Sequence, residues 1–307
     1  MALISCSQCG GKISDKAKIC PHCNHGIISS DMSNSVDFKI ESDILVRYNG
    51  NNANVTIPQG ITKIGDSAFF GNPNVESITL PNSLTSIGYD AFHFCSNLKE
   101  IVIPDSVHTI WQEAFSNCTN LKSVRLSEKI TEIGYHQFFL CTMLKKINIP
   151  DGVIKIREGA FNACNNLENI LIPKTVKQIG KGAFKESGLI NIEFEYGLEE
   201  IEENAFCACG NLIKIVFPKS LKKIGRDAFW SSSNLSEVYI SNSVTEIGAN
   251  AFKYCDKVTV IAPKGSYAEY YARTNNIPFS VGQAPKRGIK NSNSRNSFWD
   301  LFRKNQK

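Results

Sequence analysis

The chain has 307 residues, of which 42% are apolar and 21% charged, so it can build a folded core and is too apolar for an intrinsically disordered protein. Its net charge of +5 comes from the C-terminal end, because residues 283–307 hold seven basic residues and one acidic residue and leave −1 for residues 1–282. A near-neutral body argues against nucleic-acid binding along its length.

No run of about 18 apolar residues is present, and the first thirty residues hold four cysteines instead of a charged start followed by an apolar stretch. We therefore expect neither a membrane span nor an export signal. With eleven cysteines that fall into patterns typical of reduced thiols, we expect a cytoplasmic protein.

The four N-terminal cysteines form two Cys-x-x-Cys pairs separated by ten residues, Cys6 with Cys9 and Cys20 with Cys23. Two such pairs supply the four thiolates of a structural Zn²⁺ site, and the segment resembles the short N-terminal zinc ribbons of bacterial proteins. We expect a zinc ribbon over residues 1–28. A redox pair is the alternative, but it needs only one Cys-x-x-Cys and a surrounding βαβ pattern that the sequence lacks.

His22 and His25 lie beside the second pair and are interpreted as bystanders, because four cysteines already close the site. Residues 29–35 are expected to be a linker. Residues 36–281 are expected to form the main domain, which begins with a hairpin: Phe38 and Ile40 precede a polar turn that is followed by Leu45–Tyr48.

The main domain is dominated by a repeat of 23 residues with a single step of 22. An Ala-Phe-like pair recurs, and each phenylalanine follows an isoleucine by five residues. The phenylalanines are Phe69, Phe92, Phe115, Phe138, Phe161, Phe184, Phe206, Phe229 and Phe252. A period this short cannot form a core alone, so neighbouring coils must stack and share one.

Each unit also holds an alternating triplet such as Ile101-Val102-Ile103, which is typical of a short strand with its first and third side chains inward. Prolines such as Pro104 follow many of the triplets and end the strand. We expect one strand per coil, and ten parallel strands from Val55 to Ala262.

The repeat resembles BspA-like leucine-rich repeats in units such as residues 98–120, LKEIVIPDSVHTIWQEAFSNCTN. The resemblance implies a solenoid with a parallel sheet on one face, short helical or turn segments opposite, and a role in protein binding, often at bacterial cell surfaces. Downstream, Ser266 is expected to cap a helix that ends near Thr274, and a closing strand is expected near Phe279. Tyr267, Tyr270 and Tyr271 are interpreted as packing residues of this cap.

Six further cysteines follow the repeat phenylalanine by three residues and are expected to form a buried thiol column rather than a catalytic or disulfide-bonded set. They are Cys95, Cys118, Cys141, Cys164, Cys209 and Cys255. Cys207 lies outside this column and is interpreted as incidental. A glutamate cluster around Glu199 is interpreted as a ladder of salt bridges with lysines of neighbouring coils, such as Lys177 and Lys222.

The middle residue of each triplet points outward, and unlike the inward columns this position varies, so it is the candidate partner surface; surface drift is the alternative. The candidate partner-binding residues are Val102, Arg125, Asn148, Leu171, Glu193, Val216 and Tyr239. Residues 282–307 are expected to be a basic tail. Its last part, residues 298–307, combines aromatic and basic side chains and is a candidate for weak docking on a membrane or partner.

The sequence contains no convergent triad, phosphate loop or open metal site. We therefore expect no enzymatic activity and no cofactor besides structural Zn²⁺. The predicted function is a monomeric protein-interaction scaffold that binds an unidentified protein. The alternatives are a cell-surface adhesin of the BspA-like type and a nucleic-acid-associated protein that uses the ribbon and the basic tail.

Overall fold

The computed structural model describes residues 3–6, 9–14, 17, 20–23 and 37–285. The candidate docking segment 298–307 and His25 lie outside these residues, and so does the expected linker. Among the described residues, no helix combines the length and the apolar character that crossing a bilayer requires.

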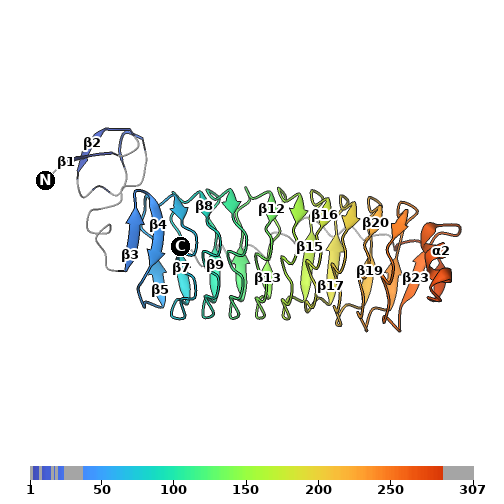
Figure 1. The fold of residues 1–307 in the computed structure, drawn as a ribbon. Coiled ribbons are helices and arrows are strands. Elements are labelled where there is room, and N and C mark those ends of the chain that lie inside the picture. Colours follow the sequence, from blue (N-terminus) through green and yellow to red (C-terminus); the bar gives the residue numbers. More distant parts are fainter. Residues whose placement is uncertain (1–2, 7–8, 15–16, 18–19, 24–36, 286–307) are drawn as a thin grey trace.

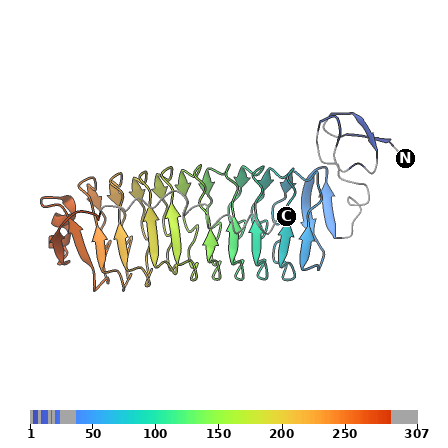
Figure 2. The same ribbon diagram turned by 180° about the vertical axis from the view of Figure 1, so that it is seen from behind.

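Residues 37–285 form a solenoid in which coils stack along one axis, and two rows of strands run along the stack from β3 and β4 to α2 (Figure 1 and Figure 2). The first row, here called the triplet ladder, contains the ten parallel strands that the alternating triplets predict. They are β5 (Asn54–Thr56), β7 (Ser77–Thr79), β9 (Glu100–Val102), β11 (Ser123–Arg125), β13 (Lys146–Ile147), β15 (Asn169–Ile172), β17 (Asn191–Phe194), β19 (Lys214–Val216), β21 (Glu237–Tyr239) and β23 (Thr259–Ala262).

The second row, here called the isoleucine ladder, is built from two-residue strands that end at the repeat isoleucine. They are β6 (Lys63–Ile64), β8 (Ser86–Ile87), β10 (Thr109–Ile110), β12 (Glu132–Ile133), β14 (Lys155–Ile156), β16 (Gln178–Ile179), β18 (Glu200–Ile201), β20 (Lys223–Ile224) and β22 (Glu246–Ile247). The prediction of one strand per coil is therefore wrong. Two residues are too few to show the alternation that identifies a strand.

The rest of each coil, here called the turn side, carries the repeat phenylalanine. Residues 54–262 contain turns there and no helix. All nine phenylalanines are buried, and their rings stack from coil to coil with centroids 5.0–5.5 Å apart. Left-handed backbone occurs two residues before and two residues after each of them, as at Asp90 and Phe94 around Phe92. These paired bends turn the chain around the ring.

Both ends of the stack are covered, as expected. The antiparallel hairpin of β3 (Phe38–Glu41) and β4 (Ile44–Tyr48) pairs with β6, and Tyr48 stacks on Phe69 with ring centroids 5.0 Å apart. At the other end, α2 (Tyr267–Thr274) begins after Ser266, whose hydroxyl accepts the N–H of Glu269 at 3.2 Å, and β24 (Phe279–Val281) pairs with β23.

The packing interpretation of the cap tyrosines is correct only for Tyr271, which is buried and meets Phe252 edge-on. Tyr267 and Tyr270 are exposed. The helix spans eight residues and turns one face to the last coil, so residues on its other face meet water.

Candidate functional site

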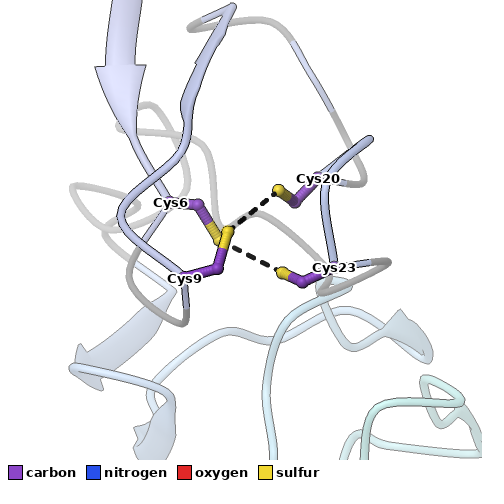
Figure 3. A group of neighbouring side chains, drawn as sticks. All are labelled: Cys6, Cys9, Cys20 and Cys23. Atoms are coloured by element: carbon purple, nitrogen blue, oxygen red, sulfur yellow. Dashed lines mark hydrogen bonds between the residues drawn. The ribbon is translucent and has the colours of Figure 1, made fainter.

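The four N-terminal cysteines come together beside a small antiparallel hairpin of β1 (Leu3–Ser5) and β2 (Lys12–Ser14). The first cysteine pair lies on the hairpin turn, where the N–H of Gly10 donates to the Cys6 carbonyl at 2.8 Å and left-handed Gly10 lets the chain reverse. Figure 3 shows the four side chains converging from both Cys-x-x-Cys segments.

The sulfur atoms lie at distances suitable for shared ligation. Cys6 Sγ is 3.7 Å from Cys23 Sγ, Cys9 Sγ is 3.7 Å from Cys20 Sγ, and all four lie within 4.8 Å of one another. These four cysteines form no disulfide with any cysteine of the chain. The His22 ring meets the Lys12 carbonyl at 3.3 Å and does not belong to this group. The cluster could hold one metal ion.

The candidate partner surface runs along the outside of the triplet ladder. Of its seven residues only Glu193 is exposed, and the other six, although they point outward, are half-buried. Strands about 4.8 Å apart let each side chain shield its neighbours on the same face. Most of these side chains therefore expose only part of their surface to solvent.

Several of these side chains are fixed by contacts within the protein. Arg125 forms an ion pair with Asp105 at 2.8 Å and donates to the Ile103 carbonyl. Tyr239 donates its hydroxyl to Glu237 at 3.2 Å, and Lys214 Nζ lies 4.7 Å from the Tyr239 ring centroid. These contacts hold the surface in one arrangement before any partner binds.

Asn148 also has a structural role that the sequence did not suggest. Its side-chain oxygen accepts the N–H of Leu126 at 3.0 Å, whereas the corresponding N–H of Ile103 one coil earlier donates to a backbone carbonyl, that of Arg125. Strand β13 stops at Ile147, one residue before Asn148. Independently of this contact, the triplet ladder is interrupted between β13 and β15 and between β17 and β19.

The six column thiols are buried, as predicted, and each lies 3.0–3.2 Å from the carbonyl oxygen of a phenylalanine 25 or 26 residues earlier, to which it donates. Burial raises the pKa of every one of them, that of Cys95 to about 12 and that of Cys255 to about 11. Burial also raises the pKa of Cys207. Thiols held in the protonated form are poor nucleophiles.

The glutamate cluster forms the predicted salt ladder beside the isoleucine ladder. Glu199 pairs with Lys177 at 3.3 Å and with Lys222 at 3.0 Å, and Lys223 pairs with Glu200 and Glu246 in the neighbouring coils. Two surface hollows lie over this region, and lysines and glutamates of the ladder contribute to the lining of both. Because these pairs are exposed to solvent, each adds little to stability.

Sequence reasoning missed one cluster on the turn side, formed by Asp90, His93 and Glu113. The signal was present in the repeat register: Asp90 and Glu113 both precede a repeat phenylalanine by two residues, and His93 directly follows Phe92. Side chains at these positions gather at one corner of two adjacent coils.

The solved structures to which the chain is similar include three leucine-rich repeat proteins. A leucine rich cell surface protein from Faecalibacterium prausnitzii A2-165 is 23% identical, with 80% of this chain and 96% of that chain covered and a TM-score of 0.35. A leucine-rich repeat protein from Bacteroides ovatus ATCC 8483 is 23% identical, with 75% of this chain and 84% of that chain covered and a TM-score of 0.40. The leucine rich repeat protein of T. pallidum is 22% identical, with 80% of this chain and 96% of that chain covered and a TM-score of 0.41. No curated protein is significantly similar to the chain.

The family model for the BspA type leucine rich repeat region, in six copies, matches residues 40–168 and 154–272. These residues contain all nine strands of the isoleucine ladder, the whole phenylalanine column and all six column thiols. The chain therefore belongs to the BspA-type leucine-rich repeat family.

Proposed function

We propose that the chain is a non-enzymatic protein-interaction scaffold whose partner binds the outer side of the triplet ladder. The observation that carries this proposal is the contrast within single strands: inward residues repeat from coil to coil, whereas outward ones vary and are held in place by contacts such as Arg125–Asp105. Leucine-rich repeat proteins generally bind other proteins, and stacked coils offer an extended rigid surface for this.

The non-enzymatic part of the proposal is supported by the family and by the chemistry of the described side chains. Leucine-rich repeat proteins are generally not enzymes. The thiols of the described main domain, residues 37–285, have raised pKa values, and the glutamates in the hollows over the salt ladder include Glu199, which is paired with lysines. Neither feature provides an activated nucleophile with its base.

The test is affinity capture from an extract of the source organism with the full-length chain and the double variant Leu171→Ala/Tyr239→Ala. A matched control removes the same kinds of side chain away from the triplet ladder, in Ile154→Ala/Tyr254→Ala. We expect the ladder variant to lose the captured partner by about ten-fold or more and the control to retain it. Equal capture by both variants contradicts the proposal.

We further propose that Cys6, Cys9, Cys20 and Cys23 hold one structural Zn²⁺. Tetrahedral Zn²⁺ with Zn–S bonds of about 2.3 Å places its sulfur ligands about 3.8 Å apart, and the 3.7 Å sulfur distances fit this geometry. The only buried apolar cluster among the described ribbon residues is Cys6, Ile13 and Cys20 with Ala17 packed against it. So small a core depends on the metal for its folding energy.

Zinc analysis of the purified protein tests this assignment. We expect Cys20→Ser to hold one Zn²⁺ per chain less than the wild type, and Cys207→Ser, which removes a thiol outside the cluster, to hold as much as the wild type. A strong chelator should make the ribbon susceptible to protease while the thermal unfolding of the solenoid stays unchanged. An equal zinc content in Cys20→Ser and the wild type contradicts the assignment.

The same thiols favour a reducing compartment, and we propose that the protein works in the cytoplasm. Oxidation to disulfides would remove the thiolate ligands that Zn²⁺ requires. The competing location is the cell surface, as in the Faecalibacterium prausnitzii protein described as a cell surface protein. Protease added to intact cells should leave the chain uncut, and cleavage would favour the surface location.

A further inference from the structure

A cluster of three metal-ligating side chains lies on the turn side, on two adjacent coils. Asp90 and Glu113 stand 23 residues apart at the same repeat position, both with left-handed backbone, with φ of 52° and 57°. Their carboxylates therefore emerge from the same corner one coil apart. His93 directly follows Phe92 and turns its ring toward this corner, between the two carboxylates.

The side-chain atoms of this cluster are already close together. His93 Nδ1 lies 2.9 Å from Asp90 Oδ1 and 3.9 Å from Glu113 Oε2, and the three ligand atoms all lie within 4.8 Å of one another. In the parts of the chain that the structure describes, only this cluster and the four ribbon cysteines bring three or more potential ligands so close.

The imidazole is held rather than free to turn away. Its side chain is 13% exposed, it stacks on Phe94 with ring centroids 4.4 Å apart, and Phe70 meets its edge at 5.3 Å. The amide of Asn117 lies 3.2 Å from His93 Nε2. An asparagine amide can donate to Nε2 or, when flipped, accept from Nε2–H, so it can support the tautomer in which Nδ1 is free to bind a metal.

We propose that Asp90, His93 and Glu113 form a second metal site, which binds a divalent transition-metal ion such as Zn²⁺ or Mn²⁺ through one nitrogen and two oxygen ligands. One imidazole with two carboxylates suits these ions. Tetrahedral Zn²⁺ with bonds of about 2.0–2.1 Å needs ligand atoms about 3.3–3.4 Å apart. The two distances from Nδ1, 2.9 Å and 3.9 Å, lie on either side of that value, so small side-chain rotations are sufficient.

The site differs from the ribbon in chemistry and in consequence. It has no thiolate, and its three protein ligands leave at least one coordination position for water or for an acceptor group of a partner. Because Asp90 and His93 belong to one coil and Glu113 to the next, a bound ion cross-links two coils at a surface flanked by Phe70 and Phe94, both exposed.

The test is calorimetric titration of the full-length protein, purified with its ribbon saturated with zinc, using Zn²⁺ and Mn²⁺ separately at neutral pH. We expect one further equivalent of at least one of these ions. His93→Gln and Glu113→Gln should each weaken this binding by about ten-fold or more, with circular dichroism confirming that both variants remain folded.

Asp227→Asn is the matched control, because Asp227 occupies the repeat position of Asp90 in a distant coil where Trp230 takes the place of His93. We expect this variant to bind the further equivalent as the wild type does. Absence of any further equivalent for both ions overturns the proposal, and so does a further equivalent that His93→Gln leaves intact. Cys20→Ser should retain the site, which separates this proposal from that for the ribbon.

Discussion

Gly188 lies where one coil is a residue shorter than the rest. Cys164 and Ser187 keep the spacing of 23, but Leu167 and Leu189 are 22 apart, so the missing residue falls next to Gly188. The shortened turn lies close to the backbone of the preceding coil, because a Cβ on Gly188 would lie 1.9 Å from the carbonyl oxygen of Asn165. The step of 22 is therefore accommodated by a residue without a side chain.

We expect Gly188→Ala to lower the free energy of unfolding by about 1–3 kcal/mol, because backbone must move to admit the methyl group. Gly210→Ala is the control, since its Cβ would meet nothing closer than Ser233 Oγ at 3.8 Å. Urea denaturation compares the two variants, and an unchanged midpoint for Gly188→Ala would contradict this explanation.

Because its thiols are buried, the thiol column makes the free energy of unfolding decrease at alkaline pH. An unfolded thiol has a pKa of about 8.5, whereas burial raises the pKa of Cys95 to about 12. Between these values the unfolded chain releases the thiol proton and the folded chain retains it. The contribution of the buried Cys95 thiol to the free energy of unfolding is therefore fully present below about pH 8.5 and is lost as the pH rises toward 12.

We expect Cys95→Ser to reduce this alkaline loss by about 2 kcal/mol at pH 10. Serine fits the column, because Ser232 occupies the same repeat position and donates to the Phe206 carbonyl at 3.1 Å. Denaturation of variant and wild type at neutral pH and at pH 10 gives the comparison. Parallel losses in the two proteins would show that the buried thiol does not cause the effect.

At the scale of the strand, two amide side chains accept backbone hydrogen bonds that other coils give to a backbone carbonyl. In the triplet ladder the Asn148 side chain accepts the N–H of Leu126, and in the isoleucine ladder the Gln137 side chain accepts the N–H of Gly134. The matching N–H of Gly88 donates to the Ile64 carbonyl. The isoleucine ladder is broken between β10 and β12, at the coil that contains Gln137.

Gln137 is fully buried and its Nε2 has no hydrogen-bond partner, while all the other eight coils have alanine at this position. We expect Gln137→Ala to raise the free energy of unfolding by about 1 kcal/mol, because an unsatisfied buried donor is removed. The Gly134 N–H can then join the ladder, and hydrogen exchange should show its increased protection. A loss of stability would mean that the volume of the side chain matters more.

These ladder features mark the limit of what the sequence could predict. The triplets alternate over three residues and predicted the ten strands of the triplet ladder, and the hairpin and helix caps were predicted from local signals. The isoleucine strands are too short to alternate, and the hydrogen bonds that the Gln137 and Asn148 side chains accept replace backbone bonds between neighbouring coils. Those contacts exist only after the coils have stacked.

The candidate sites divide in the same way. The spacing of Cys6, Cys9, Cys20 and Cys23 predicted their convergence, because local turns bring each pair together. The cluster around His93 was missed because its members belong to two coils. Their proximity becomes visible only when the repeat register is read across neighbouring units.

At the scale of the whole molecule, coils share one core and each residue's position in its coil determines its role. The stacked rings of the phenylalanine column continue from Tyr48 in the N-terminal hairpin to Phe252, where Tyr271 of α2 covers the last one. Stability therefore depends on inward columns along the full stack, which leaves the outward residues free to differ and to bind.

Adjacent residues of β15 provide the most direct test of this account, because Ile170 points inward and is 6% exposed, whereas Leu171 points outward and is half-buried. Urea denaturation of Ile170→Ala should show a loss of about 2–5 kcal/mol, with about 1 kcal/mol or less for Leu171→Ala. Equal losses for the two variants, or the larger loss for Leu171→Ala, would contradict the assignment of inward residues to the core and outward residues to binding.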